Sequence, residues 1–292
     1  EHHRRPEQTR KGLAGLDGSG VNHAVENLRR ATDVVRVHQS HSPTLPLLPR
    51  ERQGPDGIAE GTSRSTPLLN SAHPYCKELT VFFHQAPTMV TAQQALPGRA
   101  EPTFSVPGVH RVLGTSLRGP WPEGTEVLYV AMGCFWGEEK HFWQIPGVVS
   151  TAVGYMGGFT PNPTYEETCT GKTGHTETVQ IAYGPSKVST EDLIKVFWTM
   201  HDPTQVYRQG NDRGTQYRSA IFYTTDEQRD LIASSKAAYQ PQLTAAGYGP
   251  ITSDIRSAQD AGPFWYAEGY HQQYLIANPN GYCPVHATGV TF

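Results

Sequence analysis

The sequence has no long hydrophobic run and only a few cysteines. No stretch approaches the roughly 18 consecutive apolar residues of a membrane-spanning helix, which excludes a transmembrane segment. Four cysteines in 292 residues, with no Cys-x-x-Cys pair, exclude a disulfide-rich scaffold. Neither charge sign dominates, since 24 Lys and Arg stand against 27 Asp and Glu. This balance argues against a polybasic membrane anchor and against non-specific nucleic-acid binding.

The first 88 residues have few of the side chains that build a core. All four Met and all five Trp lie at position 89 or later, as do thirteen of the fourteen Tyr. Segments such as 41–46 and 61–67 show neither a helical nor a strand period, and they bury too little surface to offset a chain entropy of roughly 1–2 kcal/mol per residue. We expect residues 1–88 to be a disordered, non-catalytic extension, with a true start at Met89 as a further hypothesis. Residues 89–292 then form the functional domain.

The same 88 residues do not have the pattern of a targeting segment. A secretory signal needs roughly 7–15 apolar residues, and the apolar stretches at 45–48 and 81–83 are shorter. An Arg-rich transit peptide is poor in acids, whereas this part has nine. Together with unpaired cysteines, this favours a cytoplasmic protein. Cys76 is expected to be an uninvolved thiol.

The remaining chain alternates between strand and helix patterns. A lead-in punctuated by Pro and Gly covers 91–124. Short apolar runs predict strands at 127–132, 148–155, 178–183, 219–224 and 250–255, and capping and periodicity predict helices at 134–143, 189–200, 225–241 and 264–278. Strands separated by helices of this length indicate one α/β (α+β) domain with a mixed sheet.

The strongest chemical signal is the segment 133–137, Gly-Cys-Phe-Trp-Gly, directly after the first predicted strand. A cysteine at the start of a helix faces the positive end of the helix dipole and free backbone N–H groups, which favour the thiolate and make a nucleophile. The glycines allow a sharp turn and the close approach of a ligand. An isolated cysteine is more often an inert core residue, so the interpretation of Cys134 as a nucleophile depends on its sequence context.

That context resembles the A-type peptide methionine sulfoxide reductases. The similar segments are GCFWG at 133–137, GYMGGFTPNPTY at 154–165, GKTGHTE at 171–177, FWTMHDP at 197–203, RQGNDRGTQYRS at 208–219, YAE at 266–268, HQQYL at 271–275 and NPNGYC at 278–283. They follow one order over 125–283. The resemblance implies a single domain with a ferredoxin-like core, a mixed sheet flanked by helices, long loops and coil-rich termini.

The resemblance also implies a set of site residues. The catalytic residues are Cys134, Glu177, Tyr165, Tyr217, Asp212 and Cys283, and the substrate-binding residues are Phe135 and Trp136. Cys134 attacks the sulfoxide sulfur, releases methionine and becomes a sulfenic acid. Glu177 is the proton donor, and a carboxyl that keeps its proton near neutral pH requires a buried setting.

The remaining residues surround the substrate. Tyr165 and Tyr217 donate hydrogen bonds to the sulfoxide oxygen, and Asp212 holds substrate or water in the same network. Phe135 and Trp136 clasp the S-methyl group, which distinguishes an apolar methyl from a polar oxygen and fits the family's preference for the S epimer.

A second thiol completes the implied cycle. Cys283 resolves the sulfenic acid as a disulfide with Cys134, and because 287–292 holds no further cysteine, thioredoxin reduces this disulfide directly. Cys169 is expected to be a bystander. No bound cofactor or metal is implied. The expected partners are thioredoxin, proteins with oxidised methionine and free methionine sulfoxide, for a monomer that takes part in protein repair.

Taken singly, each of these residues has an ordinary structural interpretation. Glu177 fits a solvent-facing strand position, the tyrosines fit packing, and Asp212 fits a turn. Two other functions remain open. A Cys–His hydrolase or acyltransferase would use Cys134, His175 and Asp212, although we favour a structural His175. A zinc module would need ligands at 134, 169 and 283, a spacing that zinc sites rarely show.

Overall fold

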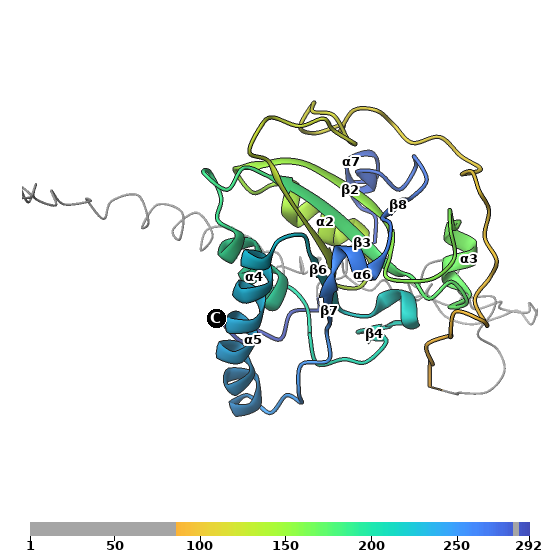
Figure 1. Cartoon of the computed structure of the whole chain (residues 1–292). Helices are drawn as coiled ribbons and strands as arrows, with labels where there is room; N and C mark the ends of the chain where they lie inside the picture. Colours follow the sequence, from red (N-terminus) through yellow and green to blue (C-terminus); the bar gives the residue numbers. More distant parts are fainter. Residues whose placement is uncertain (1–85, 283–285) are drawn as a thin grey trace, which may run out of the picture. The chain divides into compact units, whose positions relative to one another are not determined.

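The computed structural model describes residues 86–282 and 286–292, which all belong to one compact unit within Pro67–Phe292. The main sheet has six strands in the order β7-β6-β1-β3-β2-β8 (Figure 1). These strands are β1 (Glu126–Ala131), β2 (Val148–Met156), β3 (Thr176–Tyr183), β6 (Ala220–Tyr223), β7 (Asp254–Ser257) and β8 (Trp265–Tyr266). A separate hairpin pairs β4 (Arg208–Gln209) with β5 (Asp212–Arg213).

Helices connect the strands. They are α2 (Phe135–Trp143), α3 (Tyr165–Cys169), α4 (Thr190–Thr199), α5 (Asp226–Ala245), α6 (Ala258–Ala261) and α7 (Tyr274–Ala277), with a 3-10 turn, η1, at Thr215–Tyr217. The succession β1-α2-β2-β3-α4-β6, with sheet order β6-β1-β3-β2 and antiparallel neighbours, is a ferredoxin-like core. Only the β6–β7 pair is parallel among the described strands. The predicted α+β fold with a mixed sheet is confirmed.

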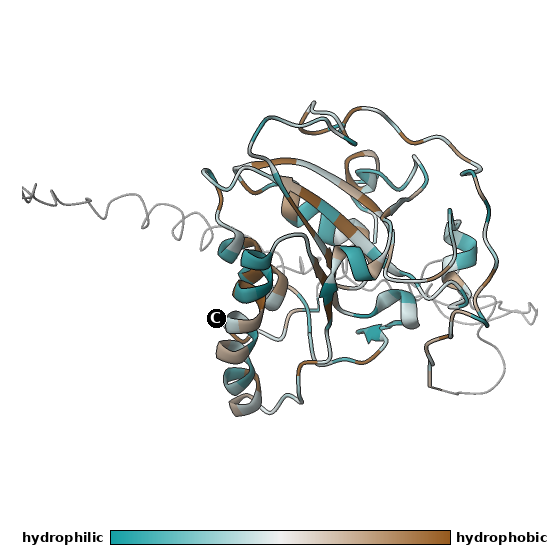
Figure 2. Ribbon diagram, in the orientation of Figure 1, coloured by the Kyte–Doolittle hydropathy of each residue, from teal (hydrophilic) through white to brown (hydrophobic). Residues whose placement is uncertain are grey.

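The two faces of the sheet are covered differently. In β1, Leu128 and Val130 belong to the large core, while Tyr129 and Ala131 point to the smaller one. The large core is completed by α2, α4 and α5, and α4 and α5 pack against each other (Figure 1). Hydrophobic residues run through the strands, whereas α5 carries both kinds along its length (Figure 2). The helices therefore lie mainly on one face of the sheet.

Two of the four predicted helices differ from the structure. The helix predicted to end at Pro241 continues through it to Ala245, and the buried Leu243 holds this extra turn on the core. The helix predicted over 264–278 is wrong. This segment forms β8, turns and the short α7, because Gln272 bonds both the backbone N–H and C=O of Val153 and so attaches the segment to the sheet edge. Buried side-chain bonds of this kind outweigh local helical periodicity.

The lead-in before β1 contacts α3 and the loops on both sides of it, and the Arg99 N–H donates to the Pro161 carbonyl in the loop before α3. The Leu96 N–H donates to the Lys172 carbonyl, and Arg99 forms an ion pair with Glu167. Glu167 also completes the capping box that starts α3, together with Thr164. The lead-in is thus part of the folded unit.

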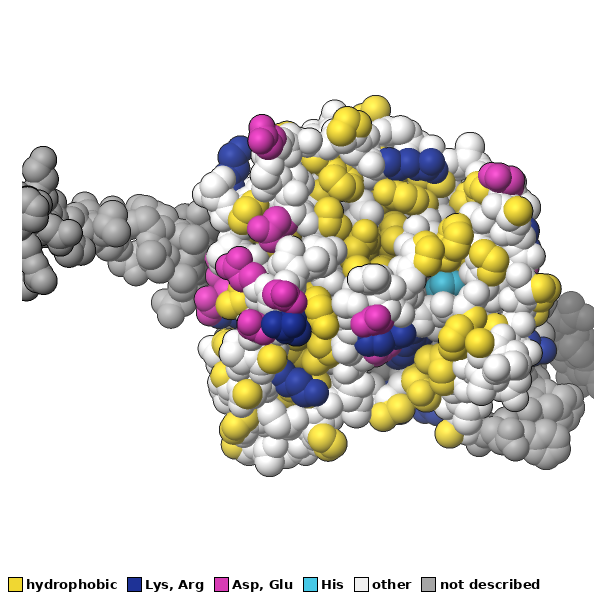
Figure 3. Space-filling model, in the orientation of Figure 1, with side chains coloured by type: hydrophobic (Ala, Val, Ile, Leu, Met, Phe, Trp, Pro, Cys, Tyr) yellow, Lys and Arg dark blue, Asp and Glu magenta, His cyan; other side chains and the backbone are white. Residues whose placement is uncertain are grey.

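The outer surface is mixed in character. On the face drawn in Figure 3, acidic side chains gather over α4 and α5, whose first turns carry acids that suit the positive end of a helix dipole. Within the described residues, no helix is both long enough and apolar enough to span a bilayer.

Candidate active site

Cys134 occupies the turn between β1 and α2. It is the N-cap of α2 and is only 9 % exposed, inside the large core. Gly133 precedes it with φ +114°, and a Cβ at this position would lie 2.8 Å from the Gln209 side chain. Only glycine meets both conditions without strain. The turn therefore presents Cys134 directly beside the β4–β5 hairpin.

Glu177 lies on β3, next to this turn. Its Oε2 accepts a hydrogen bond from the Phe135 N–H at 3.1 Å, and the residue is 1 % exposed. Burial, more than any other cause, raises the pKa of the Glu177 carboxyl well above its usual range, and the nearby charges of Asp212 and Glu268 add to the rise. The strand position that sequence periodicity would leave to solvent is therefore buried, because β3 lies in the middle of the sheet.

Tyr165 and Tyr217 meet at the same place from different elements. Tyr165 is the first residue of α3, Tyr217 ends η1, and their hydroxyls share a hydrogen bond. Burial raises both pKa values, so the hydroxyls keep their protons, and both groups interact electrostatically with Cys134 and Glu177. The loop before Tyr165 lies very close to the chain before Glu177, since a Cβ on Gly158 would lie 2.2 Å from the backbone nitrogen of His175.

Asp212 completes the cluster from β5. Both of its carboxylate oxygens accept from the Tyr282 hydroxyl, at 3.0 and 3.1 Å. Burial raises the pKa of Asp212, whereas this hydrogen bond lowers it. Asp212 interacts electrostatically with Cys134, Glu177 and Tyr217. Tyr282 therefore connects the segment before Cys283 to the cluster, a contact that the sequence did not reveal.

The environment of Cys134 differs from the sequence expectation in one respect. Burial raises the pKa of the Cys134 thiol well above its usual value, and the charge of Glu177 raises it further. The hydrogen bond from the Trp136 backbone N–H opposes this rise but is smaller. The helix terminus favours a thiolate, yet the loss of water around the buried sulfur outweighs it. The buried setting therefore favours the neutral thiol.

Phe135 and Trp136 lie within a buried aromatic group. The Trp136 indole N–H donates to His271 Nδ1 at 3.0 Å, and its rings stack on Tyr274 at 3.7 Å between centroids. His271 also packs against Phe135 and Tyr165. These contacts hold the Trp136 ring in one orientation beside Cys134.

Sequence reasoning did not assign roles to the residues that hold this aromatic group. They are His271, Tyr274, Glu268 and Tyr155. The last two are hydrogen-bonded to each other, since the Tyr155 hydroxyl donates to Glu268 Oε2 at 2.8 Å. Glu268 also accepts from the Tyr165 N–H, which fixes the start of α3. All four lie in family-like segments, at 154–165, 266–268 and 271–275, and that location was the available signal.

Comparison with known proteins identifies the family. The family model described as peptide methionine sulfoxide reductase matches residues 126–291. A relative from Caulobacter vibrioides, the peptide methionine sulfoxide reductase MsrA 1, is 56% identical over 207 residues, covering 71% of this chain and 94% of the relative. A Streptomyces griseus MsrA is 54% identical over 208 residues, covering 71% and 93%.

Solved structures agree. Methionine sulfoxide reductase A of Corynebacterium diphtheriae superposes with a TM-score of 0.63 at 48% identity, covering 70% of this chain and 98% of that one. Mxr1 from Saccharomyces cerevisiae in reduced form gives 0.52 at 34% identity, covering 57% and 93%. The chain belongs to the peptide methionine sulfoxide reductase family. It is an oxidoreductase that acts on sulfur, and its activity is the thiol-dependent reduction of methionine sulfoxide.

His175 has a structural place in this reductase. Its Nδ1 accepts from the Gly158 N–H at 3.0 Å, and its Nε2 lies 2.7 Å from the Thr160 carbonyl. Burial lowers its pKa to about 4, so the ring is neutral. Both ring nitrogens bind the loop before α3 and neither binds Cys134, so the Cys–His hydrolase interpretation has no support.

Two of the four cysteines of the reductase lie within the described residues. Cys283 and Cys76 lie outside them. Cys134 is a free, buried thiol. Cys169, at the end of α3, is disulfide-bonded, so its interpretation as a bystander thiol is wrong. Among the described residues, no group of three His, Cys, Asp or Glu side chains is arranged to hold a metal ion.

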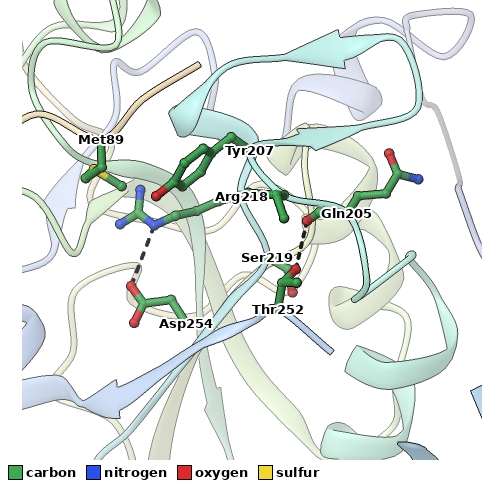
Figure 4. Close-up of a pocket in the computed structure, with 8 residues that line it drawn as sticks. Met89, Gln205, Tyr207, Arg218, Ser219, Thr252 and Asp254 are labelled. Carbon is green, nitrogen blue, oxygen red and sulfur yellow. Dashed lines mark hydrogen bonds and ion pairs between the residues drawn. The ribbon is translucent and has the colours of Figure 1, made fainter. Parts of the chain in front are cut away.

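A separate cavity of about 170 Å³ is lined in part by the two residues that follow Tyr217 (Figure 4). Its lining includes Arg218, which forms an ion pair with Asp254 at 3.6 Å, and also Tyr207 and Met89. None of the proposed catalytic or substrate-binding residues lines it. The Arg218–Asp254 ion pair at this cavity connects the residues before β6 to the first residue of β7.

Proposed function

We propose that the reductase acts on the S epimer of methionine sulfoxide, peptide-bound or free, through Cys134 and Glu177. The observation that supports this most directly is the position of Glu177. Its buried carboxyl accepts from the Phe135 amide, one residue from the thiol, and burial raises its pKa well above the usual range, which favours the acid form. A nucleophile with an acid beside it is the pair that sulfoxide reduction requires.

The chemical step removes the sulfoxide oxygen. Cys134 sulfur attacks the sulfoxide sulfur and forms a sulfur–sulfur bond, while the thiol proton and the Glu177 proton go to the oxygen, which leaves as water when the sulfur–oxygen bond breaks. Water then attacks the Cys134 sulfur, the sulfur–sulfur bond breaks with its electron pair on the methionine sulfur, and the released proton returns to Glu177. The products are methionine and the Cys134 sulfenic acid, so the cysteine sulfur is oxidised and the substrate sulfur reduced.

Two hydroxyls and two aromatic rings orient the substrate in this proposal. Tyr165 and Tyr217 stay protonated because they are buried, so both are donors for the sulfoxide oxygen. Asp212 holds substrate or water in the same network. Phe135 and Trp136 enclose the S-methyl group, and the contacts of Trp136 with His271 and Tyr274 limit its rotation. A preorganised apolar wall opposite polar donors discriminates between the two epimers at sulfur.

The epimer preference is tested by incubating the full chain with each epimer of methionine sulfoxide and a dithiol. We expect methionine from the S epimer and at least about a hundredfold less from the R epimer, since exchanging methyl and oxygen places a polar atom on Phe135 and Trp136 and leaves the hydroxyl donors unpaired. The methionine formed is measured by chromatography. Equal rates for both epimers would contradict the enclosure of the S-methyl group by Phe135 and Trp136.

The oxidised enzyme is then recycled by a second thiol. Cys283 attacks the Cys134 sulfenic acid, which forms a disulfide and releases water, and the thioredoxin dithiol reduces this disulfide. The contact of Tyr282 with Asp212 supports this role, because it holds the residue before Cys283 at the catalytic cluster. No resident cofactor takes part in these steps.

Cys283→Ser tests the resolving thiol. We expect this variant to form about one methionine per enzyme molecule and then to stop when thioredoxin is the only reductant, because the sulfenic acid has no resolving partner. The measurement is methionine formed against enzyme in a rapid-quench time course. Continued thioredoxin-driven turnover at the unmodified rate would rule out the assignment.

We further propose that residues 89–292 form the catalytic domain. The family match over 126–291 and the contacts of the lead-in with the loop before α3 support this boundary. A cytoplasmic location and a monomeric state stay predictions, as does the non-catalytic nature of 1–88, nearly all of which lies outside the described residues.

A further inference from the structure

Glu138, in the first turn of α2, is a second buried carboxyl beside the nucleophile. It lies four residues after Cys134 and is 4 % exposed. Its Oε1 accepts a hydrogen bond from the Met132 N–H, so the side chain folds back over Gly133 and Cys134. The mechanism above does not use this group.

The two buried carboxyls bind opposite ends of the same turn. Glu177 accepts from the Phe135 N–H, after Cys134, and Glu138 accepts from the Met132 N–H, before it. The Trp136 N–H in turn bonds the Cys134 sulfur. The backbone that aims this N–H at the sulfur is therefore fixed at both ends by carboxyl oxygens.

Glu138 is energetically expensive at this position. Among the described residues, its Oε2 has no hydrogen-bond partner although it is fully enclosed. A buried polar atom without a partner costs about 1–3 kcal/mol, and an apolar side chain of similar size would avoid that cost. Departures from good local packing of this kind concentrate at functional sites.

We propose that Glu138 is a positioning residue for the nucleophile, whose carboxyl oxygen holds the Met132 amide and so fixes the turn that places Cys134 sulfur on the Trp136 N–H. This inference rests on the proposed role of Cys134. It differs from the role of Glu177, because Glu138 acts on the backbone of the turn and not on the substrate.

Glu138 fills this role as a neutral acid. Burial raises its pKa well above the usual range, and the charge of Glu177, which faces it from β3, raises the pKa further. Like charges this close and this buried do not ionise together. A neutral Glu138 also adds no further negative charge beside Cys134, whose pKa a charged Glu138 would raise. Only its acceptor oxygen is needed.

The test compares three variants by the reactivity of Cys134 toward iodoacetamide across pH, read by mass spectrometry of the Cys134 peptide in the reduced full chain. Glu138→Gln keeps the length and the acceptor oxygen without an acidic proton. Glu138→Asp keeps the carboxyl but is one methylene too short. Glu138→Met keeps the length without an acceptor, and it replaces the Asp variant if that variant does not fold. Glu139→Gln is the matched control, because Glu139 is a neighbouring buried carboxyl that instead accepts from Gln273 and Thr151.

We expect Glu138→Gln and Glu139→Gln to leave the pH profile of alkylation within about twofold of the unmodified chain. Glu138→Asp and Glu138→Met should move it to higher pH by about one unit, a tenfold slower reaction at neutral pH, because the sulfur loses its aligned N–H. A merely structural role would lower the unfolding temperature without moving the thiol pKa.

An unchanged profile in the Asp and Met variants would overturn the proposal. So would a shift to lower pH in the Gln variant, since it would show that Glu138 carries a charge. Alkylation does not depend on sulfoxide turnover. A shifted profile in a chain that reduces no sulfoxide would therefore refute the proposed function and leave the positioning role standing.

Discussion

Cys134→Ser is expected to lower methionine formation by roughly 10⁴-fold or more. The reason is chemical and not geometric. Sulfur is oxidised to a sulfenic acid, whereas a serine oxygen would have to form an oxygen–oxygen bond. The buried turn with its Trp136 hydrogen bond should persist, because serine is close in size to cysteine. Methionine formed from the S epimer, with a dithiol as reductant, gives the measurement.

The matched control for this variant is Cys76→Ser, which removes a thiol from the part of the chain predicted to be non-catalytic. It should keep the activity of the unmodified chain within about twofold. Thermal unfolding of both variants separates loss of chemistry from loss of fold. Substantial activity in a folded Cys134→Ser chain would mean that another thiol is the nucleophile.

Glu177→Gln is expected to lower kcat/KM by about 10²–10⁴-fold, the range typical for loss of a general acid. Glutamine still offers an oxygen to the Phe135 N–H, so the contact that positions the side chain at 3.1 Å is retained. What disappears is the acidic proton that the buried carboxyl keeps near neutral pH. The measurement is the initial rate of methionine formation over a range of substrate concentrations.

The activity should also depend on pH in a definite direction. The acid form of Glu177 exists below its raised pKa, so the activity of the unmodified chain should be retained through neutral pH and fall as the pH rises through that value. Glu177→Gln should lose this alkaline decline together with its activity. Glu166→Gln, which neutralises an exposed carboxyl near Tyr165, is the control and should keep both the rate and the profile. An unchanged alkaline limb in Glu177→Gln would assign the proton to another group.

Much of the fold was predictable because it depends on local patterns. The run at 127–132 and the capping residues at Ser189 and Thr225 predicted β1, α4 and the start of α5 closely. The stretch from 264 was predicted wrongly, since its polar side chains bond the edge of the sheet and those partners are distant in sequence. Hydrophobic periodicity indicates on which face of a helix or strand a residue lies, but it does not indicate which distant residue that side chain will contact.

For the site, sequence patterns alone predict which residues carry the chemistry, because the family-like segments around Cys134, Glu177 and Tyr217 contain them in order. Their electrostatics depend instead on how the chain packs in three dimensions. The helix terminus predicts a thiolate at Cys134, whereas burial of the sulfur raises the thiol pKa and favours the neutral form. Burial and the distance between charges arise from packing β3, the β4–β5 hairpin and α2 together, and no single segment contains them.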